Sequence, residues 1–311
     1  MFFEIENSVL EALIDQALAT ETPTVPWQEG KAMLLPPTTA TLVSERRQLV
    51  RWLNRKGELF SRPAARAIAS RMAQCKPAQR CLSGACPECT SGFQRALVEA
   101  NQHHRHRLAD EGVGCRAVTL VAKGARFSPG QKSARERERR SNGPLEKLAA
   151  AIGRRRNVRV VGGIDLSLNV DRRGPKPFGK PFKTHWRPHL QIHIDEKLWK
   201  KIEKDVRKVF PSANQIAKPV VAKVLDLKPE ADAYVLKRLW EAGHRNRRES
   251  YQNNAVGSLF PEVKTRFQRL RVQERLDQLI YLDDLGLSRR LVLVGCRLKM
   301  TEKGPRIRAI G

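Results

Sequence analysis

The chain has 311 residues, enough for one or two domains with a sizeable hydrophobic core. Lys and Arg outnumber Asp and Glu by 59 to 32, which gives a formal net charge of +27. So basic a balance favours nucleic acid as the partner, although a ribosome-bound protein would share it. We recognise no signal peptide and no 18-residue apolar stretch that could span a membrane. We therefore expect a cytoplasmic protein that makes no membrane contact, with its six cysteines reduced unless a metal binds them.

The first 74 residues predict a helical N-terminal region. Residues 5–20 form an acidic amphipathic pattern, and four prolines within residues 21–38 indicate a linker or an extended arm. Residues 39–56 combine apolar residues at helical spacing with four arginines, and a second helix is expected over residues 63–73. Helix pairs with a basic face bind DNA in many proteins, but most helix pairs do not, so both interpretations stay open.

A cluster of cysteines follows, made of Cys75, Cys81, Cys86 and Cys89. A Cys-x-x-Cys turn presents two sulfurs to one tetrahedral ion, and Gly84 and Pro87 favour a tight knuckle. Structural Zn²⁺ is the preferred interpretation, and reduced cysteines in a loop are the alternative. A redox role would require a thioredoxin-like setting that the sequence does not show.

The next segments predict a basic helix and two strands. His103, His104 and His106 could compete as metal ligands, but a basic helix facing DNA is the preferred interpretation. Residues 114–122 predict a short strand, residues 123–140 a mobile basic loop, and residues 145–152 a helix. After three arginines, residues 158–170 alternate apolar and polar side chains. This second strand should pair with the strand after it, and its polar face could add a metal ligand.

Residues 185–195 contain the candidate metal site. From His189 onward polar and apolar residues alternate, which is the period of a half-buried strand. Successive strand side chains point to opposite faces, so His189, Gln191 and His193 share one face. Two imidazoles and an amide oxygen suit Mn²⁺, or Mg²⁺ with waters completing the shell. The alternative is an edge strand whose polar face meets solvent.

A helix beginning near Pro229 is expected to carry Glu230, Tyr234 and Lys237 on one face. Beside a metal-binding strand, these groups could transfer a phosphoryl group. Tyr234 would be the nucleophile, Lys237 and the metal would neutralise phosphate charge, and Glu230 would handle a proton. The alternative is a core tyrosine beside a solvated ion pair.

The remaining segments predict further helices and a last strand. A helix is expected over residues 197–209, a basic turn over 243–248 and a charged amphipathic helix over 261–285. Residues 291–300 predict a strand that could close the sheet.

Together and in this order, the motifs resemble those of the HUH endonucleases, in particular the rolling-circle replication initiators of plasmids and small DNA replicons. The three matching segments are Val118-Thr119-Leu120-Val121, Pro188-His189-Leu190-Gln191 and Tyr234-Val235-Leu236-Lys237. Gln191 departs from the usual His and is similar to the variant of circovirus-type initiators. The cysteine knuckle also resembles one found in several initiators. The resemblance covers about residues 75–240.

The resemblance implies an α+β fold, with an HUH/RRM-like nuclease core built on an antiparallel sheet with flanking helices. The expected parts are a helical region with a proline-rich linker (1–74), a zinc knuckle with a basic helix (75–110), the nuclease core (111–245), and a C-terminal helix with a closing strand (246–311).

The activity implied is metal-dependent nicking and joining of single-stranded DNA, or of an origin hairpin, through a 5′-phosphotyrosine on Tyr234. Glu230 would activate water for the second cleavage, and host replication machinery would be a further partner. DNA contacts are expected from Arg154, Arg155, Arg156, Arg187 and Arg238. A relaxase or transposase of the same fold is one alternative, and a basic RNA-binding or ribosome-associated protein is another. A further alternative is a zinc-containing DNA-binding protein without catalysis. Gln191 and the absence of a Glu near Asn169 are the features that support this alternative.

Overall fold

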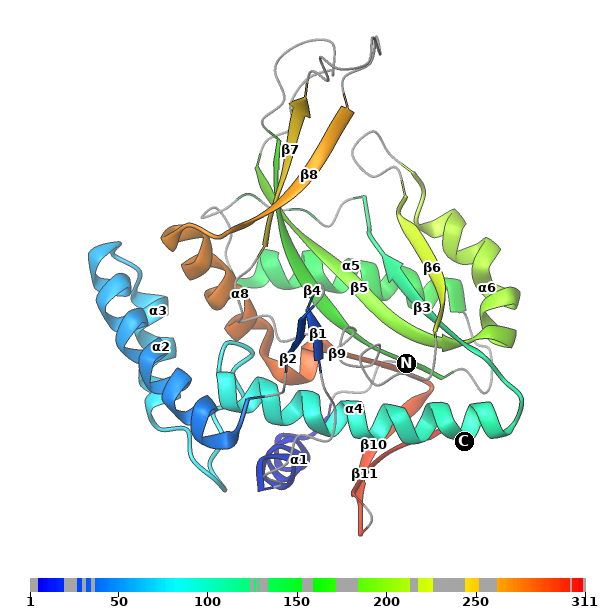
Figure 1. Cartoon of the computed structure of the whole chain (residues 1–311), viewed down its shortest axis with the longest axis horizontal. Coiled ribbons are helices and arrows are strands. Elements are labelled where there is room, and N and C mark those ends of the chain that lie inside the picture. The colour runs from blue at the N-terminus through cyan, green and yellow to red at the C-terminus, as the bar shows by residue number, and fades with distance from the viewer. Residues whose placement is uncertain are drawn as a thin grey trace.

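The computed structural model has an α+β architecture in which a central sheet lies among helices (Figure 1). It describes residues 5–19, 27–29, 32–34, 37–123, 126, 128, 134–152, 159–171, 184–212, 218–225, 244–251, 262–302 and 304–309. For residues 27–29, 32–34, 134–142, 170–171, 244–251, 262–269 and 309 only the backbone is described. The expected α+β class, with an antiparallel sheet and flanking helices, is confirmed.

Seven strands of the described residues form the central sheet. Five of them are antiparallel neighbours in the order β6-β3-β5-β4-β9. Their bounds are β3 Cys115–Leu120, β4 Val160–Asp171, β5 His185–Asp195, β6 Val220–Leu225 and β9 Leu291–Val294. The end of β4 also pairs in parallel with β7 (His244–Tyr251), whose other neighbour is the antiparallel β8 (Glu262–Arg269). β4 is thus extended by β9 at its beginning and by β7 at its end.

The predicted pairing of the two long strands is confirmed, with Asp165 opposite His189. One face of β5 is apolar, and Leu190, Ile192 and Ile194 on it are at most 1% exposed. Helices α5 (Ala134–Ile152) and α6 (Glu196–Val209) pack against this face, because their own apolar residues join the same core.

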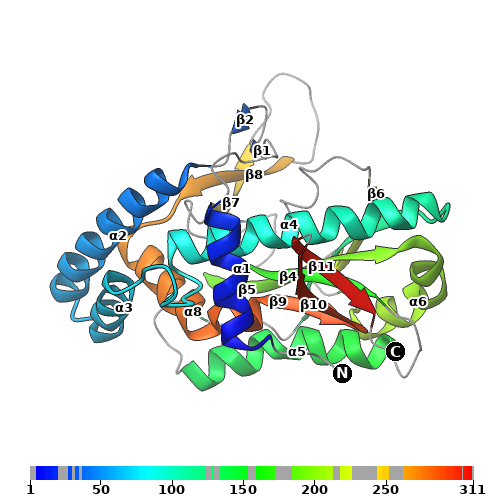
Figure 2. The same cartoon turned by 90° about the horizontal axis from the view of Figure 1, so that it is seen from below.

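The opposite face of the sheet meets α4 (Pro87–Asp110), and Figure 2 shows α4 and α5 on opposite sides of the strands. Helices α1 (Asn7–Ala19) and α2 (Thr39–Leu59) pack against α4. Helices α2 and α3 (Pro63–Ala73) pack against the last helix, α8 (Val272–Arg290). The predicted helices over residues 5–20, 39–56 and 63–73 are confirmed. Between α1 and α2, the strands β1 (Trp27–Glu29) and β2 (Ala32–Leu34) form a small hairpin within the predicted arm.

Three predicted elements differ from the structure in their type of secondary structure, and a fourth is interrupted. Residues 243–248, predicted as a basic turn, are largely part of β7, where pairing with β4 and β8 outweighs a weak local signal. The helix predicted over residues 261–285 begins only at Val272, because residues 262–269 form β8, in which Val263, Thr265 and Phe267 alternate at the period of a strand. The basic loop predicted up to residue 140 becomes helical from Ala134, and the i,i+4 spacing of Glu136 and Arg140 in the sequence favours a helix there.

The C-terminal strand predicted over residues 291–300 is interrupted at Gly295, whose φ of +67° suits glycine. Before the break, β9 completes the central sheet beside β4. After it, β10 (Cys296–Thr301) forms an antiparallel hairpin with β11 (Gly304–Ala309). The central sheet therefore takes strands from both sides of the part boundary expected at residue 245.

Candidate metal centre and the polar face of the sheet

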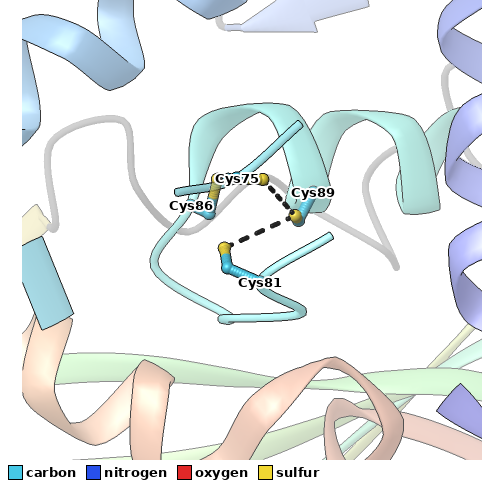
Figure 3. A group of neighbouring side chains, drawn as sticks. All are labelled: Cys75, Cys81, Cys86 and Cys89. Atoms are coloured by element: carbon cyan, nitrogen blue, oxygen red, sulfur yellow. Dashed lines mark hydrogen bonds between the residues drawn. The ribbon is translucent and has the colours of Figure 1, made fainter. Parts of the chain in front are cut away.

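The four clustered cysteines converge on one point between α3 and α4 (Figure 3). Cys75 follows α3, Cys81 lies in the connecting loop, Cys86 caps α4 and Cys89 is in its first turn. All four sulfurs lie within 4.8 Å of one another. The Sγ atoms are separated by 3.5 Å for Cys75–Cys89, 3.6 Å for Cys81–Cys89 and 4.0 Å for Cys75–Cys86.

These separations fit a tetrahedral ion. Zn–S bonds of about 2.3 Å place the sulfurs of a tetrahedral site about 3.8 Å apart. No disulfide joins the cysteines, and Cys75, Cys86 and Cys89 are buried. The cluster could therefore bind a metal such as zinc. Among the described residues this is also the one group of three or more His, Cys, Asp or Glu side chains with such geometry, so the histidines of α4 do not join it.

The pKa values of the clustered thiols are shifted in different directions, as expected for thiols close enough to share negative charge. Burial raises the pKa of the Cys86 thiol well above its ordinary value. A hydrogen bond with Cys75 does the same for the pKa of Cys89, whereas hydrogen bonds, first of all from Cys81, lower the pKa of Cys75. Four thiolates cannot coexist here without a cation to balance them. Metal binding would therefore release protons from the cluster.

A buried ion network supports the cysteine cluster. Glu88, which is 3% exposed, accepts hydrogen bonds from Arg46 of α2 and, at 2.8 Å, from Arg80 of the cysteine loop. Arg80 also donates to Asp15 of α1 at 2.6 Å, and Arg46 donates to the carbonyl of Met72 at 2.8 Å. The network therefore joins four helices, α1 to α4, to the loop that holds the cysteines. The sequence analysis missed it, because nothing in the local pattern separates Arg46 and Glu88 from solvated charges.

The residues of the predicted catalytic-metal site lie on the polar face of β5. Because β5 lies between β3 and β4, the alternative of an exposed edge strand is wrong. The three side chains bond to three different neighbours. His189 Nε2 lies 3.1 Å from Ser167 Oγ of β4, Gln191 Oε1 accepts from Thr119 Oγ1 of β3 at 2.7 Å, and His193 Nδ1 lies 2.8 Å from Asn101 Nδ2 of α4.

Helix α4 covers one end of this polar face. Asn101 and His104 face the sheet and are 1% and 7% exposed, and Arg105 is buried too. Burial lowers the pKa of His104 to about 4. Of the three histidines on the helix predicted to face DNA, His103 and His106 are exposed, but His104 is buried. Asn101 and His104 continue the spacing of Leu97 and Leu108, a signal that could have identified the buried polar side of this helix.

Of the other predicted site residues, one is buried on β5 and the rest lie outside the described residues. Arg187, expected to contact DNA, is 7% exposed and lies on the polar face of β5 rather than in solvent. The remaining predicted groups lie outside the described residues: Arg154, Arg155, Arg156, Glu230, Tyr234, Lys237 and Arg238.

No protein-family model, curated protein or solved structure matches this chain. The resemblance to HUH endonucleases therefore rests on the motifs and their order. No helix in the described part of the chain is long and apolar enough to cross a membrane.

Proposed function

We propose that the chain is a metal-dependent endonuclease of the HUH type that nicks and joins single-stranded DNA, as in rolling-circle replication. The observation that carries the proposal is the position of the first two motifs. β3 and β5 are neighbours in the middle of the antiparallel sheet, and Thr119 of the first motif donates a hydrogen bond to Gln191 of the second. Two motifs 70 residues apart in the sequence thus meet on one polar face. The net charge of +27 supports a nucleic-acid substrate.

The donors on this face suit a divalent metal. His189 offers an imidazole nitrogen, Gln191 an amide oxygen, and Asp165, opposite His189 on β4, a partly exposed carboxylate. This makes Asp165 the candidate for the acidic ligand that the sequence lacks near Asn169. Bound Mn²⁺ or Mg²⁺ would supply charge to polarise the scissile phosphate.

The chemistry proposed for the chain's own residues is a transesterification. The hydroxyl of Tyr234 loses its proton and attacks phosphorus, a Tyr–phosphate bond forms, and the bond to the 3′ oxygen breaks. The products are a 5′-phosphotyrosine and a free 3′-hydroxyl, so joining is the reverse reaction. Lys237 would neutralise phosphate charge, and Glu230 would activate water for a hydrolytic second step.

The test is trapping of the covalent adduct. Wild-type protein incubated with Mn²⁺ and a 3′-labelled single-stranded oligonucleotide should give a labelled, denaturation-resistant protein–DNA band that depends on the metal, whereas a 5′-labelled oligonucleotide should release its label on the fragment that ends in the 3′-hydroxyl. The band should disappear in Tyr234→Phe and weaken strongly in His189→Ala, whereas the matched control Tyr251→Phe should keep it. An adduct that survives in Tyr234→Phe would overturn the assignment of the nucleophile.

A second candidate is a zinc-containing DNA-binding protein without nuclease activity. It is favoured by the hydrogen bonds of Thr119 to Gln191 Oε1 and of Asn101 to His193 Nδ1, which engage one atom of each of these two predicted ligands. This candidate predicts DNA binding by the wild type with no adduct across an oligonucleotide panel, and binding that His189→Ala leaves unchanged.

A further inference from the structure

A cavity of about 510 Å³ lies between α2 and the first turn of α8, away from the polar face of β5. Its lining includes Arg51, Trp52 and Arg55 from α2 and Arg275 from α8, with Glu45 as the one carboxylate among the described residues there. Figure 1 places α2 and α3 at the left edge of the molecule, with β5 near its centre. Three guanidinium groups and one carboxylate line the cavity, so the net charge of its lining is positive.

Arg275 is the most constrained of these arginines. Its guanidinium stacks over the ring of Trp52, 4.9 Å from the centroid. No described residue forms an ion pair with it. Burial lowers the pKa of Arg275, but a guanidinium stays protonated. The fold thus holds a positive charge against an aromatic ring at the cavity wall, with no acidic partner among the residues that the structure describes.

The outer surface of α2 extends this positive wall. Arg47, Arg51 and Arg55 are exposed and lie four residues apart, on one side of the helix. Their backbone positions are about 6 Å apart along the helix axis. Arg271, the N-cap residue of α8, is also exposed, one turn before Arg275. A row of evenly spaced guanidinium groups can contact successive phosphates, because the planar guanidinium bonds to two phosphate oxygens at once.

We infer that the cavity between α2 and α8, together with the exposed arginines of α2 beside it, binds the phosphodiester backbone of DNA at a site separate from the polar face of β5. We call this surface the α2–α8 cleft. The choice of DNA as the ligand rests on the proposed function, but the site does not require nicking. Backbone contacts of this kind anchor and orient DNA without reading its sequence. The stacked Arg275–Trp52 pair would provide the fixed end of the contact, and the arginines of α2 would provide its length.

Binding measured without divalent metal separates this inference from catalysis. Fluorescence anisotropy with a labelled 30-nucleotide DNA, single-stranded and duplex, would be recorded over a range of salt concentrations for the full-length protein. The test variant is Arg51→Gln/Arg55→Gln. The control is Arg297→Gln/Arg308→Gln, an exposed pair lying opposite each other in β10–β11 that removes the same charge elsewhere. A third variant, Arg275→Gln, removes the stacked guanidinium.

We expect the test variant to bind DNA about tenfold or more weakly and its log–log salt slope to fall by about 2, one for each lost phosphate contact. The control should stay within about twofold of the wild type, and Arg275→Gln should weaken binding. Equal losses in test and control would overturn the site, because the effect would then be general charge. If the cleft variants lose binding only to an RNA of the same sequence, RNA and not DNA is the ligand. Failure of nicking with cleft-dependent binding intact would contradict the proposed function and leave this inference standing.

Discussion

Glu88→Gln tests how much the fold depends on the ion network beside the cysteines. Glu88 is 3% exposed and bonds to the guanidinium groups of Arg46 and Arg80, so the substitution leaves two positive charges in the interior with one partner fewer. Removing one member of a buried pair costs about 3–5 kcal/mol. Arg80 keeps Asp15 and Arg46 keeps the Met72 carbonyl, so we expect the lower end, about 3 kcal/mol.

Urea unfolding of the metal-loaded protein, followed by circular dichroism at neutral pH, would measure this loss. Glu203→Gln is the matched control, since Glu203 also pairs with an arginine, Arg207, but on the exposed surface of α6. An exposed pair of this kind contributes at most about 0.5 kcal/mol. A loss below about 1 kcal/mol for Glu88→Gln, or equal losses in both variants, would refute the reasoning.

Three further predictions follow from particular contacts. Chelation, or Cys89→Ser, should lower the unfolding temperature and abolish a zinc content of one ion per chain measured by atomic absorption, whereas Cys296→Ser should leave the zinc content unchanged. Gly162→Ala should destabilise the protein by about 3 kcal/mol in urea unfolding, because the added methyl group would lie 2.1 Å from the Gln191 carbonyl oxygen. A hydrogen bond from Arg116 lowers the pKa of Glu196, so the stability contributed by this pair should be present above pH 4.5 and be lost as the pH falls through the lowered pKa. NMR titration of Arg116→Gln should show that pKa raised toward its ordinary value.

The sequence predicted the structure best where the spacing of apolar residues matches the pattern of buried side chains. The alternation in residues 185–195 was enough to predict β5 and its polar face, because one face of that strand is fully buried. Pro63 at the first turn of α3 fixed the beginning of that helix. The cysteine spacing predicted convergence of four sulfurs without any knowledge of the surrounding helices.

Long-range pairing explains most of what the sequence did not reveal. The polar residues of β7 have no apolar alternation, and that strand exists because it pairs with β4 and β8. The partners of the predicted metal ligands were hidden for the same reason. Asn101 lies 92 residues from His193 and Thr119 lies 72 from Gln191, so no local pattern could connect them.

One helix joins the cysteine cluster to the polar face of β5. Cys86 and Cys89 fix the first turn of α4, and the same helix delivers Asn101 to His193 about 18 Å farther along its axis. Cys86, Cys89 and Glu88 are buried at the beginning of α4, and Asn101 is buried against the sheet, so the helix is held at two places along its length. The cysteine cluster thus does more than stabilise a loop: it sets the position from which α4 covers the end of the face that carries His189 and Gln191. If the cluster binds a metal, removing that metal is expected to loosen the cover of that face as well as the knuckle itself.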